Sequence, residues 1–181
     1  LASTYAADAR GGWTLSGQKK FITRANVADM FVVVARREDG PAGAKGLSAF
    51  VVPRDAKGVT VSEVIPKLGW YGVPIAMVSF DNVRVPQGYL LGKEGEGMKL
   101  AQDTLLRARI GHAAIALGRA SGALHIASQY ANQRQVFGQS VGERNYSEET
   151  AREIDTEVRT LVQAAFERAV AILSGNRALL D

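Results

Sequence analysis

The hydrophobic pattern of this chain changes its period once, at about Gly97. Before that residue, short apolar runs alternate with polar positions, and all five prolines lie at or before Pro86. After it proline is absent, and apolar residues recur every three or four positions. A period of two is typical of strands and a period near 3.6 of helices. The sequence therefore predicts an α+β fold with a β domain over residues 1–95 and a helical part over residues 96–181.

Five segments of the first half have the composition of strands. In these segments apolar and polar residues alternate or β-branched residues predominate, and glycine or proline separates one segment from the next. Trp13 and Leu15, and then Phe21 and Thr23, follow a period of two on either side of a predicted turn at Gly17. MFVVVARR (residues 30–37) predicts a strand buried on both faces. Together these segments predict an antiparallel β barrel or sandwich over residues 11–92.

Two long amphipathic helices are predicted in the second half, over residues 97–134 and 147–174. The apolar stripe of the first includes Ile110, Leu117 and Leu124. A polar break at 138–146 separates the two helices. Ser147 is suited to cap the second helix and Gly175 to end it. Helices joined by so short a connection predict an antiparallel hairpin.

Charge and composition exclude several classes of function. Through Gly142 the chain has 17 Lys and Arg against 10 Asp and Glu, and afterwards 5 against 8. The positive charge is dispersed, so we expect no nucleic-acid partner. No apolar run approaches the roughly 20 residues of a membrane span, so we expect no membrane association. The chain has no cysteine and no signal-peptide pattern, which together favour a cytoplasmic location.

Several strings resemble the acyl-CoA dehydrogenase family over residues 1 to about 140. They are WTLSGQKKFIT, LGWYGVPIAMVSFDNVRVP, LLGKEGEGMKLAQ and YANQRQVFGQSV, in the order that the family has them. The resemblance implies FAD as cofactor, with Phe21 and Thr23 against the flavin ring. It also implies that Arg134 and Phe137 bind the diphosphate and adenosine part across a subunit boundary.

Other roles for these four residues stay open. The family's usual residue at the position of Phe21 is tryptophan. From the residues alone, we would interpret Phe21 as a core residue of the barrel and Thr23 as an ordinary strand residue. Arg134 also fits an exposed position at a helix end, where the helix dipole favours a cation.

The resemblance does not supply a catalytic base. Some members of the family have a glutamate on the first long helix just before an arginine, and here Ala108 precedes Arg109. Asp103 is five residues away and on a different helical face. The other base position of the family, its N-terminal helical domain and the loop before residue 1 are expected to be missing. We therefore predict no catalytic residue and no turnover by this chain alone.

The last forty residues have a second resemblance. VGERNYSEETAREIDTEVRTLVQAAFERAVAILSGNRALLD (residues 141–181) is similar to a helical segment of FtsH-type ATP-dependent zinc proteases, and a generic amphipathic helix is the alternative. The first resemblance together with this one predicts a chimera. The protease's His-Glu-x-x-His motif is absent, and His112 and His125 have no acidic residue between them. No metal site and no protease activity are therefore expected.

Three hypotheses about function follow. The chain is a chimeric or truncated derivative without a reaction, a residual module that holds FAD weakly and lacks a base, or a subunit completed by partner chains. We expect FAD binding by this chain to be absent or no better than micromolar. A hairpin of two helices cannot bury both of its apolar faces against itself. We therefore expect a homodimer in which two hairpins form a four-helix bundle.

Overall fold

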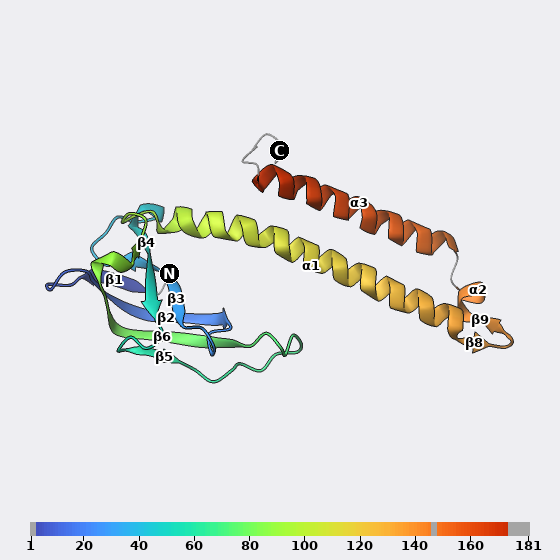
Figure 1. Cartoon of the computed structure of the whole chain (residues 1–181), viewed down its shortest axis with the longest axis horizontal. Helices are drawn as coiled ribbons and strands as arrows, with labels where there is room; N and C mark the ends of the chain where they lie inside the picture. The colour runs from blue at the N-terminus through green and yellow to red at the C-terminus, as the bar shows by residue number, and fades with distance from the viewer. Residues whose placement is uncertain (1–2, 146–147, 174–181) are drawn as a thin grey trace. The chain divides into compact units, whose positions relative to one another are not determined.

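The computed structural model describes residues 3–145 and 148–173, and the chain divides into two compact units, Leu1–Asp103 and Thr104–Asp181 (Figure 1). The first unit is dominated by strands and the second by helices. The α+β class predicted from the change of period is confirmed. Each unit is described by itself below.

A seven-stranded sheet forms the first unit. Its strands are β1 (Thr4–Ala7), β2 (Trp13–Thr23), β3 (Met30–Arg37), β4 (Leu47–Pro53), β5 (Val59–Val61), β6 (Ile75–Val85) and β7 (Leu90–Leu91). Their order across the sheet is β5-β6-β2-β1-β3-β4-β7. Two short 3₁₀ helices, Ala44–Gly46 and Gln87–Tyr89, precede β4 and β7.

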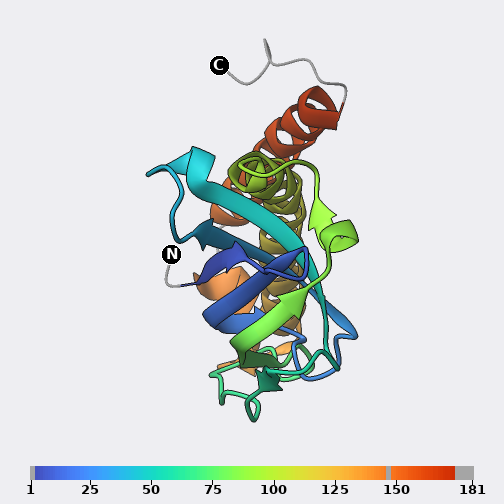
Figure 2. The same ribbon diagram turned by 90° about the vertical axis from the view of Figure 1, so that its left-hand side faces the viewer.

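The sheet is mixed, which corrects the predicted antiparallel pairing, and its described strands do not form a clearly closed barrel. β1 pairs with β2 in antiparallel orientation but with β3 in parallel orientation, with Thr4 opposite Arg36. The parallel pair arises because the connection after β2 places β3 on the far side of β1. In the described residues the sheet ends at β5 on one side and β7 on the other. Figure 2 shows how strongly its strands twist about one another.

The core lies on one face of this twisted sheet. Tyr5, Leu15, Phe50, Val78 and Val83 are among the side chains that are almost fully buried there. β3 and β6 are not neighbours in the sheet, yet the rings of Phe31 and Phe80 approach to 6.4 Å between centroids. The sheet therefore curls far enough for its two halves to share a single core.

β2 is one continuous strand, so the predicted turn at Gly17 is wrong. Gly17 has a φ of 132° and lies at the first of two register shifts between β2 and β6. A glycine within a strand is typical of such irregularities, because it tolerates backbone angles that other residues avoid. Gly17 therefore marks an irregularity in the pairing of β2 with β6 and not a turn.

A polar cluster holds the beginning of the first long helix, α1 (Gly97–Gln133), against the sheet. The buried Tyr5 hydroxyl lies 2.7 Å from Ser48 Oγ and donates to Glu94 at 3.0 Å. Ser48 Oγ accepts from the backbone of Gly95, and Arg37 pairs with Glu94 at 2.7 Å. Burial is the main cause that raises the pKa of Tyr5. Three strands and the residues before α1 are joined in this way.

The second unit contains most of α1, a two-stranded hairpin of β8 (Gln135–Val136) and β9 (Gln139–Ser140), α2 (Val141–Asn145) and α3 (Glu148–Leu173). The bounds of α1 and α3 agree with the predicted helices to within one residue. The predicted cap Ser147 and stop Gly175 lie outside the described residues. No described helix has the length and apolar character that a bilayer crossing requires.

The predicted polar break contains more structure than expected. Ser140 Oγ accepts from the backbone N–H of Glu143 at 3.1 Å, and the Glu143 carboxylate accepts from the backbone N–H of Ser140 at 3.0 Å. This reciprocal pair is a capping box, which satisfies two donors at a helix start. It fixes the beginning of α2 directly after the β8–β9 hairpin.

Candidate functional site

The end of β2 contains a bulge that changes the direction of its side chains. Lys19 lies opposite Val78 and Ile22 opposite Ala76, so two residues of β2 face one residue of β6. Phe21 is one of these two residues of β2 and has a φ of 59°, in the left-handed region. Bulges often re-aim side chains beside functional sites. Phe21 is 66 % exposed, which contradicts the alternative that it belongs to the core.

Thr23 follows the bulge on the face opposite the core. It pairs with Ile75, whereas its neighbour Ile22 packs against the core. The Thr23 side chain is exposed. Its hydroxyl has no hydrogen-bond partner within residues 3–145 and 148–173, so it is available to a ligand.

Exposed apolar side chains of β3 extend the same face. Met30 and Val32 are 61 % and 66 % exposed, and they alternate with the buried Phe31 and Val33. The prediction that this strand is buried on both faces is therefore wrong. Because β3 begins with consecutive apolar residues, the sequence does not show which of them are buried and which are exposed. This part of the surface could therefore not be identified from sequence.

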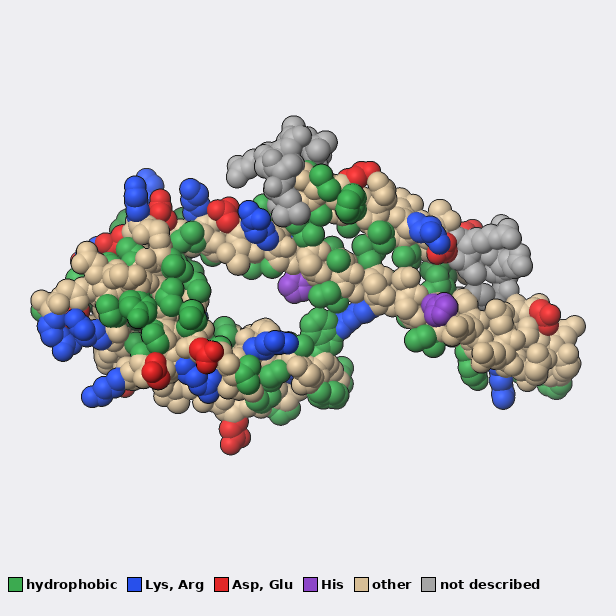
Figure 3. Space-filling view, in the orientation of Figure 1, with side chains coloured by type: hydrophobic (Ala, Val, Ile, Leu, Met, Phe, Trp, Pro, Cys, Tyr) green, Lys and Arg blue, Asp and Glu red, His purple; other side chains and the backbone are tan. Residues whose placement is uncertain are grey.

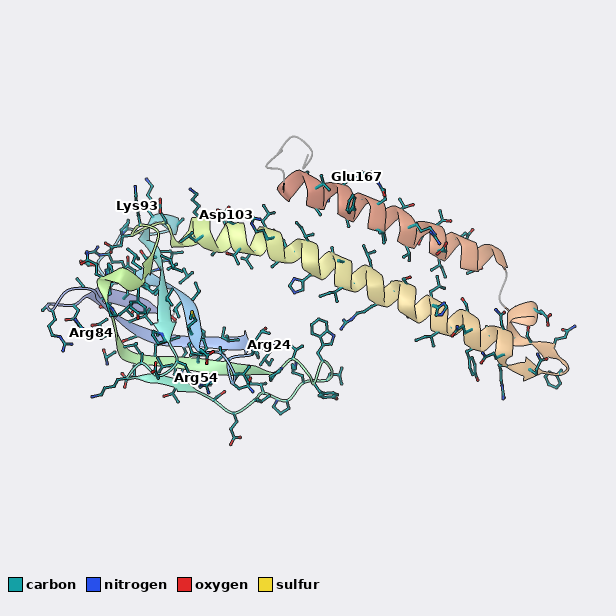
Figure 4. The ribbon with its side chains drawn as sticks, viewed as in Figure 1. Arg24, Arg54, Arg84, Lys93, Asp103 and Glu167 are labelled. Carbon is teal, nitrogen blue, oxygen red and sulfur yellow. The ribbon has the colours of Figure 1, made fainter. Side chains whose placement is uncertain are left out.

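The turn between β2 and β3 is held by backbone and arginine contacts. Arg24 has a φ of 57°, and its backbone N–H donates to Pro74 at 2.8 Å. Arg54 donates to the carbonyl oxygen of Ala25 at 2.8 Å. The side-chain oxygen of Asn26 is buried and has no hydrogen-bond partner in the described part of the chain. Figure 4 labels Arg24, which follows β2, and Arg54, which follows β4.

Arg134 and Phe137, the other two predicted site residues, lie in the second unit, after α1. Phe137 and Gly138 form the tip of the β8–β9 hairpin and have φ values of 51° and 80°. Two consecutive positive values are typical of the type I′ hairpin turn, where asparagine and glycine are favoured. Phe137 is nevertheless 89 % exposed there. The Arg134 side chain is exposed just before this hairpin.

The four predicted residues thus form two pairs in different units. Phe21 and Thr23 share the end of β2, and Arg134 and Phe137 share the region after α1. The geometry of each unit by itself therefore does not bring the two pairs together into one site.

The acidic and metal-binding groups of α1 are few. Asp103 is the only acidic residue between Gly97 and Gln133, and it lies on the exposed surface of the first turns (Figure 4). His112 is hydrogen-bonded through Nδ1 to the backbone of Ala108 at 2.9 Å. The described residues contain no group of three side chains suited to hold a metal ion.

Two family models match the chain. The model of the acyl-CoA dehydrogenase middle domain matches residues 1–83, and the model of the acyl-CoA dehydrogenase C-terminal domain matches residues 95–179. The two matches are consecutive and together include most of the sheet and both long helices.

Curated proteins and solved structures give the same result. The chain is 42 % identical over 138 residues to an acyl-CoA dehydrogenase of Bacillus subtilis, covering 76 % of the chain and 36 % of that protein. It is 34 % identical over 170 residues to a glutaryl-CoA dehydrogenase of Desulfococcus multivorans, covering 93 % and 43 %. The structure of an acyl-CoA dehydrogenase from Geobacillus kaustophilus matches with a TM-score of 0.91 and 28 % identity, over 98 % of this chain and 47 % of that one. The chain therefore spans about two fifths of the length of the curated relatives that it matches.

These matches do not support a join to an FtsH-like protease segment near residue 141. A single family model continues through that position to residue 179, and so does the similarity over 93 % of the chain. The change in charge at Gly142 lies within the helical part, between the basic α1 and the acidic α3. One amphipathic helix also resembles many unrelated ones in its pattern of alanine, leucine and charged residues. The chain belongs to the acyl-CoA dehydrogenase family, and it matches the middle domain and the C-terminal domain of that family.

Proposed function

We propose that this chain provides the flavin-binding surface of an FAD-dependent acyl-CoA dehydrogenase. Enzymes of this family use FAD. The observation that carries the proposal is the end of β2, where the bulge exposes an aromatic ring, Phe21, beside a threonine hydroxyl without a described partner. Neither feature contributes to the core of the sheet.

The residues present fit a flavin ring. The ring is flat, largely apolar and polar at its edge. Phe21, Met30 and Val32 offer exposed apolar surface, and the Thr23 hydroxyl offers a hydrogen bond to the ring edge. When bound, FAD would supply the acceptor for a hydride from the acyl thioester. Phe21 would shield one face of the ring from water, and Thr23 would orient it.

Arg134 and Phe137 are proposed to bind the diphosphate and adenosine part of an FAD held by another subunit. A guanidinium can hold two phosphate oxygens through paired hydrogen bonds. Phe137 presents an almost fully exposed ring from a turn whose backbone angles do not favour phenylalanine. An aromatic residue in a backbone conformation that costs free energy supports a contact with a ligand or partner at this position.

We further propose that the chain has no turnover by itself. Oxidation of an acyl thioester requires a base to remove the α proton as the hydride leaves. Ala108 stands where some members of the family have a glutamate, and the exposed Asp103 is the only acid on α1. A subunit whose partner chains supply the base is the alternative, and activity that appears only on co-expression with such partners would support it.

FAD titration followed by flavin fluorescence tests the proposal. We expect a dissociation constant no better than micromolar, because this chain covers only about two fifths of the length of its curated relatives. Thr23→Val should weaken binding about tenfold, as the loss of one hydrogen bond predicts. Thr60→Val, at an exposed threonine of the edge strand β5, should leave it unchanged.

Two outcomes would contradict the proposal in different ways. No detectable binding at high micromolar FAD would exclude a flavin surface in this chain. Equal weakening by Thr23→Val and Thr60→Val would place the flavin somewhere other than the end of β2. Nanomolar affinity would refute the expected weakness, and Arg134→Ala should then reduce it.

Self-association is proposed for the helical unit. A groove of about 770 Å³ is lined by Ile110 and Leu117 of α1 and by Val158, Val162 and Phe166 of α3. Phe166 is 64 % exposed, and Figure 3 shows hydrophobic side chains along α3. A second copy that covers this groove with its own helices would form a four-helix bundle.

A further inference from the structure

The sheet of the first unit has an interrupted ladder between β2 and β3. β1 lies between these strands only where it pairs with residues 13–16 of β2 and residues 36–37 of β3. Ser3 continues the separation through contacts with Gln18 and Arg36. Beyond Gln18, β2 keeps β6 as its partner and β3 keeps β4, but no strand of residues 3–145 lies between them.

The Lys19 side chain extends into this interruption. Its Nζ donates to the carbonyl oxygen of Val34 on β3 at 2.7 Å. The side chain is half-buried, and desolvation lowers the pKa of its ammonium group. A hydrogen bond from a charged donor is stronger than one between neutral groups. The Lys19 side chain thus connects β2 to β3, whereas elsewhere in the sheet backbone hydrogen bonds connect neighbouring strands.

The position of this contact along β2 is specific. Lys19 is the last residue in register before the bulge, and the next residue in register is Ile22. The bulge is held by β6 on one side and, on the other, by the contact from Lys19 to β3. A bulged strand bends and twists more than a regular one, so its exit direction depends on the residues that anchor it.

We propose that Lys19 is a positioning residue for the flavin surface: by joining β2 to Val34 of β3, it fixes the bulge that presents Phe21 and Thr23. The proposal rests on the proposed function for its consequence in FAD binding. Its structural part, that the hydrogen bond from Lys19 to Val34 orders the bulge, can be tested without flavin.

Three variants of the full chain separate this role from a general effect on stability. Lys19→Met keeps most of the aliphatic side chain and removes the donor. Lys19→Arg keeps a charged donor at nearly the same reach. Lys20→Met is the matched control, because Lys20 lies in the same bulge but its exposed side chain is bonded to no described residue.

The first experiment measures amide hydrogen exchange without flavin, together with the free energy of unfolding in urea. In Lys19→Met, exchange at Phe21, Ile22 and Thr23 should rise about tenfold, as expected for local opening after loss of a charged hydrogen bond. Exchange in the β3–β4 ladder should not change. Lys20→Met should match the parent chain. A uniform rise across the whole sheet, or no rise at the bulge, would overturn the proposal.

The second experiment measures FAD affinity and the visible spectrum of the bound flavin. Lys19→Met should raise the dissociation constant about tenfold and shift the spectrum towards that of free flavin, because one charged contact no longer orders the surface. Lys19→Arg should restore both to within about threefold, and Lys20→Met should change neither. Unchanged affinity and spectrum in Lys19→Met would refute the positioning role. If the parent chain binds no FAD, the proposed function fails, while the exchange experiment still decides whether Lys19 orders the bulge.

Discussion

Five described residues other than glycine have φ values in the left-handed region: Phe21, Arg24, Trp70, Asn82 and Phe137. Asparagine tolerates this region, but the other four have side chains that disfavour it. Three of them are aromatic and at least 46 % exposed. Their strain therefore is not offset by burial in the core. Residues kept in such conformations cluster at functional positions, and two of these three are proposed to contact FAD.

Replacement of Arg24 by a residue that tolerates the left-handed backbone conformation should stabilise the fold. Its φ of 57° costs energy, whereas its backbone contacts to Pro74 and Ala28 do not require an arginine side chain. We expect Arg24→Asn to raise the free energy of unfolding by about 0.5–1 kcal/mol. Urea denaturation measures this change. Gln18→Asn, at an exposed residue in regular register opposite Ser79, should instead be neutral or destabilising, since asparagine is disfavoured in strands. Destabilisation by Arg24→Asn would show that the arginine side chain has a structural role.

At the scale of elements, the start of α1 depends on the absence of a side chain at Gly97. A Cβ there would lie 2.6–2.8 Å from backbone atoms of Ser48. That backbone is fixed by β4 and by the cluster of Tyr5 and Glu94, so it cannot move away easily.

Gly97→Ala should therefore lower the free energy of unfolding by about 2 kcal/mol or more, as for overpacking at a buried position. Gly111→Ala is the matched control on the same helix, because a Cβ at Gly111 meets nothing within 4 Å. It should raise stability by up to about 1 kcal/mol through helix propensity. Thermal or urea unfolding compares the two. Similar effects of both substitutions would mean that α1 does not begin in close contact with β4.

The existence and type of the elements followed from local pattern, but their pairing did not. The two periods located both helices to within a residue and most of the strands. The order of the sheet depends on the position of β1 between β2 and β3, and no local signal in the sequence predicts that position. The antiparallel arrangement of the two helices stays a prediction.

The candidate site shows the same limit at finer scale. Phe21 and Thr23 were identified through family resemblance, whereas the bulge that exposes Phe21 came from the structure. The role of Lys19 depends on an interruption between two distant strands, which sequence cannot show. The start of α2 did have a local signal, the spacing of Ser140 and Glu143. It lay in a stretch interpreted as a polar break.

For the whole molecule, the main prediction is a homodimer through the helical unit. Sedimentation velocity at tens of micromolar should give a species twice the 19.4 kDa of the chain. Replacing Val158 and Leu161 together with aspartate should yield a monomer, because charges in an apolar interface are strongly unfavourable. The strand signal in circular dichroism should persist.

A monomeric parent chain would exclude the dimer. Loss of the strand signal in the double variant would indicate instead that α3 is required for the β domain to fold. As a control, aspartate at Thr160, whose hydroxyl is bonded only within its own helix, should leave the oligomeric state unchanged.

The pairing of β2 with β6 also sets the order in which the sheet can form. β3 and β4 are joined by a short connection and can pair as soon as both are synthesised, but Trp13 must wait for Val85 to reach its place opposite. Contacts so distant in sequence make folding slow, in the range of about milliseconds to seconds. Until residue 85 leaves the ribosome, the edge of β2 that carries the bulge has no partner. Newly made chains are therefore most vulnerable to aggregation through this edge during that interval, and closure of β6 onto β2 is the step that ends it.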